Sequence, residues 1–268
     1  MNYIVLGPEG TFTDLAFQKI KSKNDQATYL SSIEDVLSTV KNDELGIVPI
    51  ENTLDGYIQP SLDGIFKNNL LIIDEINLPI AFSLIGNISS LEKVKRLYVQ
   101  FATKGQCLDL IKKMSKSAII LTESNTSSYE AIKGNAFGDA AIVPSHLVND
   151  DKPCFLRNVA DTQDNQTRFV IVSKKQIILP SKSYRVTFIV TPVIDRPGLL
   201  YDILSTFKKN NINLTSILSR PTREHMGNYH FFLEIILSEN KRDYVISILS
   251  KPNDAYSIQV IGVCPVRE

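Results

Sequence analysis

Short apolar runs alternate with segments of helical spacing along the first two thirds of the chain, and this alternation constrains the fold most. The run from Tyr3 to Gly7 ends in a Gly-Pro turn, and apolar residues then recur at helical spacing from Phe12 to Ile20. Further apolar runs follow, separated by helical or polar segments: LGIVPI, LIID, AFSLIG, RLYVQ, AIILT and AAIVP. Strands that alternate with helices are typical of parallel-rich α/β sheets. We therefore predict an α/β fold.

Polar residues mark the places where helices begin and where ligands could bind. Thr11 with Asp14, and Ser31 with Glu34, have the spacing of an N-cap and an acidic first turn. Three polar turns follow predicted strands: GPEGTFT, PIENTLDG and TESNTSS. In open α/β sheets ligands bind beyond the carboxyl ends of the strands, yet each turn is also an ordinary turn or helix cap. The first turn lacks the spacing and lysine of a phosphate-binding loop.

The pattern changes after VIVSKK, and we place a domain boundary near Ser181. Strand, helix, strand, strand, helix and strand are expected from six segments: YRVTFIVT, RPGLLYDILSTFKKN, INLTSILS, NYHFFLEIIL, KRDYVISILSK and SIQVIGVCPV. That order is the ferredoxin-like βαββαβ unit, and a unit of about 85 residues can hold a core of its own. We predict two domains, residues 1–180 and residues 181–268.

Composition excludes several classes of function. Lys plus Arg and Asp plus Glu number 29 each, so no net charge would draw the chain to nucleic acid or to an anionic membrane. No apolar window is long enough to span a bilayer, and no secretory signal is present; we expect a cytoplasmic protein with a small-molecule partner. Cys107, Cys154 and Cys264 are far apart and read as core thiols, and the histidines lack ligand spacing, so no metal is expected.

Four stretches taken together resemble prephenate dehydratase, the family that converts prephenate to phenylpyruvate in L-phenylalanine biosynthesis. In chain order they are GPEGTFTDLA, GIVPIENTLDG, a Gln-Cys pair at residues 106 and 107 on a predicted helix, and DTQDNQTRF. The E-N-[ST] and N-x-T-R-F motifs are specific in combination. The later stretch DRPGLLYDILSTFKKNNINLTSILSRPT resembles the ACT regulatory domain that follows the catalytic region in that family. The resemblance covers nearly the whole chain.

The resemblance implies two α/β lobes, like a type 2 periplasmic binding protein, with the active site in the cleft between them. Prephenate loses its ring hydroxyl and one carboxylate, and because aromatisation drives the reaction, a donor at the leaving hydroxyl suffices and no cofactor is implied. By resemblance, Thr167 is this catalytic donor. Strand alternation sets Thr167 and Phe169 on one face and Arg168 on the other, where Arg168 can pair with Glu51 or another carboxylate. The substrate-binding residues it implies are Thr11, Glu51, Asn52, Thr53, Gln106, Thr126, Ser127, Asn165, Arg168 and Phe169.

The resemblance further implies L-phenylalanine as an allosteric effector and a homodimer or homotetramer, because two ACT domains would bring two motifs together at a seam. The expected effector residues are Asp195, Pro197, Gly198, Leu199, Leu200, Leu218, Ser219, Arg220 and Pro221. Gly198 would let a ligand approach the backbone closely. No nucleic acid and no membrane are expected as partners.

Three stretches depart from the family's pattern. The S-H-P-Q run before the Gln-Cys pair is here VQFATKG, the A-A-x-x-Y-G-L segment is replaced by LVNDDKPCFLRN, and Leu218 stands where E-S-R-P has glutamate. Arogenate, with an amino group in place of the keto oxygen, stays open as an alternative substrate, and a non-catalytic amino-acid sensor stays open as an alternative function. A chorismate-processing fusion is not expected, because no helical segment of that kind precedes Met1 or follows Glu268.

Overall fold

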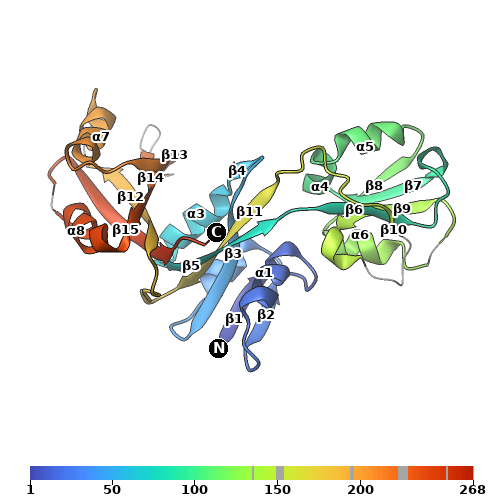
Figure 1. The fold of residues 1–268 in the computed structure, drawn as a ribbon, viewed down its shortest axis with the longest axis horizontal. Coiled ribbons are helices and arrows are strands. Elements are labelled where there is room, and N and C mark those ends of the chain that lie inside the picture. Colours follow the sequence, from blue (N-terminus) through green and yellow to red (C-terminus); the bar gives the residue numbers. More distant parts are fainter. Residues whose placement is uncertain (135, 149–153, 194–195, 223–228, 252, 268) are drawn as a thin grey trace.

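The computed structural model describes residues 1–268 except 135, 149–153, 194–195, 223–228, 252 and 268. Three units lie in a row along an elongated molecule, with the first lobe in the middle, the second lobe at one end and the C-terminal domain at the other (Figure 1). The chain builds most of the first lobe, crosses to the second, and returns before it enters the C-terminal domain. A site between the lobes is therefore made from segments far apart in sequence.

The first lobe is a mixed sheet with three helices. Its elements are β1 (Asn2–Leu6), α1 (Phe12–Ile20), β2 (Gln26–Leu30), α2 (Ile33–Thr39), β3 (Glu44–Asn52), β4 (Gly56–Tyr57), α3 (Gln59–Lys67), β5 (Leu71–Pro79) and the returning β11 (Gln166–Ser173). Strands β2, β1 and β3 are parallel, and β11 lies between β3 and β5, antiparallel to both. Thr11 caps α1 as predicted, whereas α2 is capped one residue later than predicted, by Ser32.

The second lobe is a five-stranded sheet in the order β10-β6-β9-β7-β8. Its elements are β6 (Phe82–Gly86), β7 (Arg96–Gln100), α4 (Phe101–Gly105), α5 (Leu108–Lys113), β8 (Ala118–Thr122), α6 (Asn125–Ala131), β9 (Asp139–Pro144) and β10 (Cys154–Leu156), with short 3-10 turns at Leu91–Lys93 and Ser145–Leu147. The Gln-Cys pair lies at a junction and not within one helix, because Gln106 ends α4 and Cys107 begins α5.

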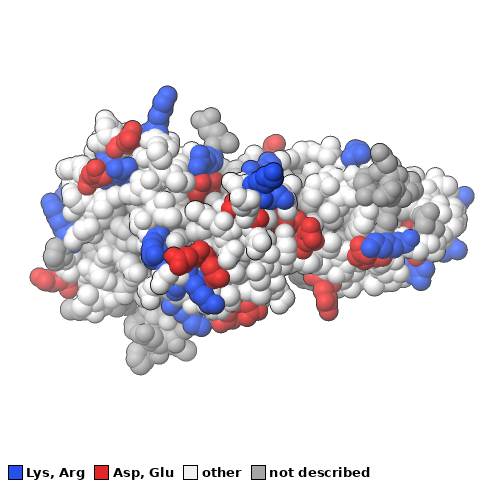
Figure 2. Space-filling model, turned by 90° about the horizontal axis from the view of Figure 1, so that it is seen from below, with Lys and Arg blue, Asp and Glu red and all other residues white. Residues whose placement is uncertain are grey.

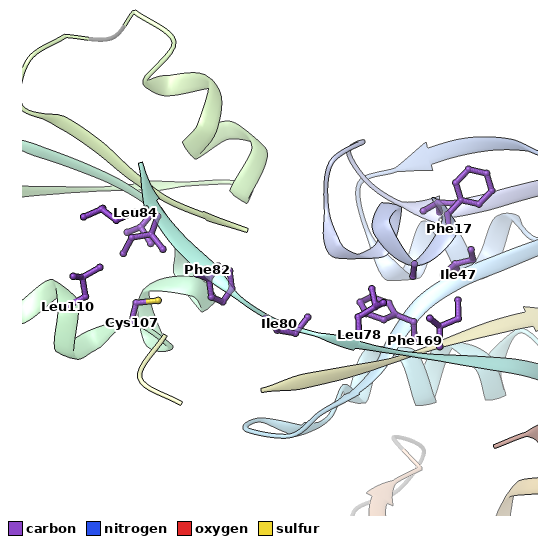
Figure 3. Close-up of a cluster of buried hydrophobic side chains, with 14 of the residues drawn as sticks. Phe17, Ile47, Leu78, Ile80, Phe82, Leu84, Cys107, Leu110 and Phe169 are labelled. Carbon is purple, nitrogen blue, oxygen red and sulfur yellow. The ribbon is translucent and has the colours of Figure 1, made fainter. Parts of the chain in front are cut away.

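A continuous crossing joins the two lobes. Strand β5 runs almost directly into β6, and the N–H of Ile80 donates to the carbonyl of Asn165 on the returning segment, at 2.8 Å. Figure 3 shows every second side chain along this crossing, namely Leu78, Ile80, Phe82 and Leu84. At the first-lobe end they lie near Phe17, Ile47 and Phe169, and at the second-lobe end near Cys107 and Leu110, all in one buried cluster. Both walls of the cleft are therefore tied to one apolar cluster.

The C-terminal domain has the predicted βαββαβ order. Its elements are β12 (Ser183–Pro192), α7 (Leu199–Lys209), β13 (Leu214–Pro221), β14 (Tyr229–Ser238), α8 (Glu239–Leu249) and β15 (Tyr256–Pro265). One face of its sheet packs on α7 and α8, and the other contributes Ile189, Phe232 and Ile261 to a core cluster shared with the first lobe. Strand β15 also pairs with β5 at Gly262 and Ile72, where a Cβ on Gly262 would lie 2.6 Å from that of Ile72.

Charges of both signs are mixed on the surface. Figure 2 shows Lys and Arg side chains interspersed with Asp and Glu, and neither sign gathers into one large patch on this face. Within the described ranges no helix is long and apolar enough to cross a membrane. The same residues include no group of three His, Cys, Asp or Glu side chains placed to hold a metal ion.

Candidate active site

A cleft of about 260 Å³ lies between the two lobes and receives side chains from both. Its apolar lining comes from the interlobe crossing and the ends of neighbouring elements: Phe12, Pro49, Ile58, Ile80, Phe82, Ala102 and Phe169. Its polar lining comes from strand ends and helix starts: Thr11, Thr13, Asn52, Asp55, Gln100, Thr103, Gln106, Asn125 and Thr167. The cleft therefore offers apolar side chains beside neutral polar groups and one carboxylate.

Asn52 is the centre of the hydrogen-bond network on the first-lobe wall. Its Oδ1 accepts from the backbone N–H groups of Leu54, at 2.9 Å, and Asp55, at 3.3 Å. Because a backbone N–H can only donate, this pair sets the orientation of the amide. The Nδ2 group therefore faces the other way, where it donates to Asn165 Oδ1 at 2.8 Å and to Thr167 Oγ1 at 2.9 Å. All three side chains are buried.

The Thr167 hydroxyl is held as an acceptor and keeps its own proton for the cleft. Thr167 on β11 lies directly opposite Asn52 on β3, and Asn52 Nδ2 occupies one of its lone pairs. Among the described residues, no acceptor is hydrogen-bonded to the Thr167 proton. A hydroxyl that accepts a hydrogen bond is polarised and becomes a better donor. Thr167 can therefore donate to a ligand in the cleft.

Gln106 links the two walls of the cleft. Its Oε1 accepts from Asn165 Nδ2 at 2.9 Å, and its Nε2 donates to Asp55 Oδ2 at 3.3 Å. Asp161 holds the segment that carries it: the Asp161 carboxylate caps the start of α5, accepting from Leu108 N–H at 2.8 Å, and the Asp161 N–H donates to the Gln106 carbonyl at 2.8 Å. Asp161 belongs to the DTQDNQTRF stretch, so this motif supports both walls.

Three polar side chains that the second lobe contributes to the cleft were not predicted as site residues. Gln100 Oε1 accepts from the N–H groups of Ala102 and Thr103, at 2.8 and 3.1 Å, and the Thr103 hydroxyl donates to Asn125 Oδ1 at 2.7 Å. These hydrogen bonds are accepted by the amide oxygens of Gln100 and Asn125, so the N–H₂ groups of the same two amides remain available as donors. Gln100 ends β7 and Asn125 begins the helix after β8, so the strand-end rule that selected the polar turns could have found them.

Several residues expected to bind substrate do not line this cleft. Glu51 and Arg168 lie on the opposite face of the sheet, because side chains alternate along a strand, and their charged groups are 2.8 Å apart. Thr53 joins two loops, accepting from the N–H of Gln166 at 3.0 Å. Two hydroxyls of the α6 start also lie outside it: Thr126, near Gly10, and Ser127, 2.8 Å from Ser124 Oγ. Asn165 lies just behind the lining residues, bonded to Asn52 and Gln106.

The cleft favours hydrogen bonding over nucleophilic chemistry. Cys107 is fully buried, and burial, with a smaller contribution from Asp161, raises the pKa of its thiol to about 12, so it stays protonated at neutral pH. Helix α1 begins at the cleft, where its first-turn N–H groups have no intrahelical acceptor and carry partial positive charge. Neutral donors and this helix start can hold the carboxylates of a ligand, and the Thr167 hydroxyl can donate to another of its oxygen atoms.

Comparison with known proteins identifies the family. The family model "Prephenate dehydratase" matches residues 3–177, and the model "ACT domain" matches residues 188–239. The chain belongs to the prephenate dehydratase family. The predicted family and its hydro-lyase enzyme class are thereby confirmed.

Relatives of known function and solved structures agree with this assignment. A prephenate dehydratase of Methanocaldococcus jannaschii is 30% identical, over 97% of this chain and 96% of its own length. A bifunctional chorismate mutase/prephenate dehydratase of Aquifex aeolicus is 33% identical over 86% of this chain, and the match spans 64% of that relative. The crystal structure of a Staphylococcus aureus prephenate dehydratase has a TM-score of 0.80 at 28% identity, covering 98% of this chain and all of its own.

A second solved structure shows the same fold. It is an Arthrobacter aurescens prephenate dehydratase in complex with L-Phe, with a TM-score of 0.82 at 24% identity, covering 99% of this chain and 90% of that one. The predicted α/β fold with a C-terminal ACT domain is thus confirmed.

Proposed function

We propose that this chain converts prephenate to phenylpyruvate in the interlobe cleft and that Thr167 is the donor to the leaving hydroxyl. The observation that carries the proposal is the pairing of Asn52 and Thr167, in which the buried hydroxyl accepts from Asn52 at 2.9 Å and keeps its proton for the cleft. A donor held in place before the reaction costs no reorganisation when the leaving group develops charge.

The chemistry divides between substrate and protein. The ring C–O bond breaks and the oxygen leaves as water. The Thr167 hydroxyl donates to this oxygen as it leaves, and the proton that completes the water molecule comes ultimately from solvent. The bond to the ring carboxylate breaks in turn, carbon dioxide leaves, and the electron pair enters the ring, which becomes aromatic. Since the substrate supplies the driving force, the protein has to orient the ring and donate to one oxygen.

The lining suits such a substrate. The apolar side chains, among them Phe12, Phe82 and Phe169, can hold the ring. The amides of Gln100, Gln106 and Asn125 can donate to the carboxylates. The amide oxygen of each already accepts a hydrogen bond from another group of the protein. These hydrogen bonds fix which side of each amide carries the N–H₂ group.

Substitution at Thr167 tests the proposal. Thr167→Ala should lower kcat by roughly a hundredfold or more, the usual scale for one transition-state donor, with little change in melting temperature, and Thr167→Ser should retain more activity. Turnover is measured as release of phenylpyruvate from prephenate, and the same assay with arogenate tests the alternative substrate. Near-native turnover by the alanine variant would remove Thr167 from this role.

We further propose that L-phenylalanine regulates the enzyme through a homodimer of the C-terminal domain. The Arthrobacter relative crystallised with L-Phe supports an effector site of this kind. Gly198 supports it too, because it adopts φ +82° at the start of α7, and, its chain neighbours aside, no atom of the described residues lies within 4 Å of the place where its Cβ would be. A ligand can approach the backbone there. Asp195, also expected at this site, lies outside the described residues.

Arg220 of the second expected effector motif contacts the first lobe. Its Nη2 is 2.7 Å from Asp63 Oδ2 and its Nη1 donates to Gln59 Oε1 at 2.6 Å, both on α3. The residue before α3, Ile58, lines the cleft. The effector motif and the cleft are therefore connected through one helix.

Gly198→Val should abolish the response to phenylalanine, because a branched side chain is strained at a positive φ and fills the open space. The measured quantity is the ratio of turnover with and without phenylalanine, and light scattering gives the oligomeric state. Calorimetry that detects no phenylalanine binding to the intact protein would end the regulatory proposal. A cytoplasmic location stays a prediction.

A further inference from the structure

A buried cluster of charges lies behind the catalytic strand, on the face of β11 away from the cleft. We call it the Arg168 cluster, and its members are Arg168, Arg185, Glu51, Glu75 and Glu234. Arg168 Nη2 is 2.8 Å from Glu51 and 2.9 Å from Glu234, and Arg168 Nη1 is 3.4 Å from Glu75. Arg185 contacts Glu75 at 2.8 Å and Glu234 at 3.2 Å. Arg168, Glu75 and Glu234 are 6% exposed or less.

Two separate parts of the chain build this cluster. Glu51 and Glu75 come from β3 and β5, which flank β11 on either side, whereas Arg185 and Glu234 come from β12 and β14 of the C-terminal domain. The cluster therefore forms only when the C-terminal sheet is packed on the first lobe.

Glu234 accepts hydrogen bonds from four side chains. Besides both arginines, it accepts from the Thr187 hydroxyl at 2.9 Å and from the Tyr57 hydroxyl at 2.8 Å. Burial alone would raise the pKa of Glu234, but Arg168 and Arg185 hold it below its ordinary value. Burial alone would likewise lower the pKa of Arg168, and the carboxylates around it, Glu234 first, raise it above its ordinary value. Glu234 and Arg168 are therefore both charged at neutral pH.

The register of the sheet connects this cluster to the catalytic hydroxyl. Across β11 and β3, Thr167 lies opposite Asn52 and Arg168 lies opposite Glu51. The first pair points into the cleft and the second pair points into the cluster, because neighbouring side chains alternate between faces. The register then shifts between Arg168 and Phe169, an irregularity of the kind that bends a strand and redirects its side chains.

We propose that Glu234 of the C-terminal domain is a positioning residue for Thr167, acting through Arg168. Glu234 binds the Arg168 guanidinium on the face of β11 away from the cleft and so fixes the position of the β11 backbone at the irregularity between Arg168 and Phe169. The position of this backbone in turn sets the distance between the Thr167 hydroxyl and the leaving oxygen of the substrate. This inference rests on the proposed function of Thr167. It assigns to the C-terminal domain a direct part in the geometry of the catalytic site.

Glu234→Gln is the test variant, because it keeps the volume and leaves two arginines facing two carboxylates, so no buried cation is left unpaired. It should lower kcat roughly tenfold, since sub-ångström displacement of a reacting group already slows catalysis, while KM changes by less than about threefold. The decisive measurement is the same substitution in the Thr167→Ala background. There Glu234→Gln should change the residual kcat by less than about twofold, because residues that act through one group are non-additive.

The outcomes separate the two proposals. If Thr167→Ala keeps near-native turnover, the proposed function is overturned. If Thr167→Ala loses activity but Glu234→Gln keeps native kcat, or lowers kcat equally in both backgrounds, the positioning role alone is overturned. Should Glu234→Gln fail to fold, Thr187→Val removes one hydrogen bond to Glu234 at nearly constant volume, and an unchanged kcat in that variant would equally overturn the inference.

A matched control removes a different buried carboxylate. Asp139 in the second lobe is 6% exposed and binds Arg96 through two hydrogen bonds, at 2.6 and 2.7 Å, and it does not line the cleft. Asp139→Asn should lower the melting temperature without changing kcat. A loss of kcat in this control as large as that in Glu234→Gln would show that any buried charge loss slows turnover, and would contradict the inference.

Discussion

Asn52→Asp would reverse the direction of the hydrogen bond between residue 52 and Thr167 while preserving the shape of the side chain. The substitution replaces the Nδ2 amide group by an oxygen and keeps the Oδ1 that accepts from Leu54 and Asp55, so the turn after β3 should still form. The new oxygen would face Asn165 Oδ1, the Gln166 carbonyl and the Thr167 hydroxyl, at 2.8, 3.1 and 2.9 Å. Of these three only Thr167 carries a proton, so its hydroxyl would turn from the cleft toward the new carboxylate.

The size of the effect follows from what is lost. Thr167 ceases to be a donor to the leaving oxygen, and removal of one such donor costs roughly 10² to 10³ in kcat. Asn165 Oδ1 also loses its partner, and an unsatisfied buried group costs roughly 1–3 kcal/mol of stability, whereas the Gln166 carbonyl still accepts from the N–H of Thr53 at 2.9 Å. We therefore expect at least about a hundredfold lower kcat and a lower melting temperature at pH 8.

The pH dependence distinguishes this mechanism from simple damage. Burial beside two carbonyl oxygens raises the pKa of the new carboxyl, because both effects disfavour the charged form. Once protonated it donates one hydrogen bond again, so the ratio of variant to wild-type kcat should rise as the pH falls from about 8 to about 5. Asn240→Asp adds the same charge at an exposed position at the start of α8, away from the cleft and from the Arg168 cluster, and should leave kcat unchanged. A pH-independent ratio, or native kcat at pH 8, would refute the reasoning.

Three further predictions follow from burial and close packing. Cys107 should resist thiol reagents in the native protein at pH 8 and react once denaturant is added, because its thiol is buried and its pKa is about 12; equal rates in both states would contradict this. The folded protein lowers the pKa of Glu234, so the stability that this carboxylate contributes is present above its ordinary pKa of 4.5 and is lost as the pH falls below that value. Between about pH 5 and pH 3 the melting temperature of Glu234→Gln should therefore fall less than that of the wild type. Gly262→Val should destabilise the protein by more than roughly 2 kcal/mol, because a Cβ there would lie 2.6 Å from that of Ile72; an unchanged unfolding midpoint in urea would show that the two strands separate easily.

Local features of this fold were predictable because they depend on short-range periodicity and capping. The segment RPGLLYDILSTFKKN predicts α7, and its Leu199, Ile203 and Phe207 recur at helical spacing and are the residues that become buried. Strand alternation in QTRF separates Thr167 from Arg168, and the structure has this arrangement. In both cases neighbours in sequence decide the outcome.

Long-range features could not be read from the sequence. Glu234 lies 66 residues from Arg168, and only the docking of the C-terminal sheet on β11 makes it a partner. Gln100 and Asn125 each also serve as an ordinary polar residue at a helix start, so their residue type alone does not mark them as site residues. Which amide turns its N–H₂ group toward the cleft depends on acceptors supplied by the folded loops.

The orientation of Arg168 also makes sense for the reaction. In a decarboxylation the carboxylate that leaves loses its negative charge as the C–C bond breaks. A guanidinium bound to that carboxylate would stabilise the ground state more than the transition state and would slow the step. Arg168 adjoins Thr167, the proposed donor, in sequence but is held on the far face by Glu51, Glu75 and Glu234. The lining residues of the cleft are neutral apart from Asp55, so in the proposed reaction the leaving carboxylate would meet neutral hydrogen-bond donors, whose interaction with it weakens as its charge is lost.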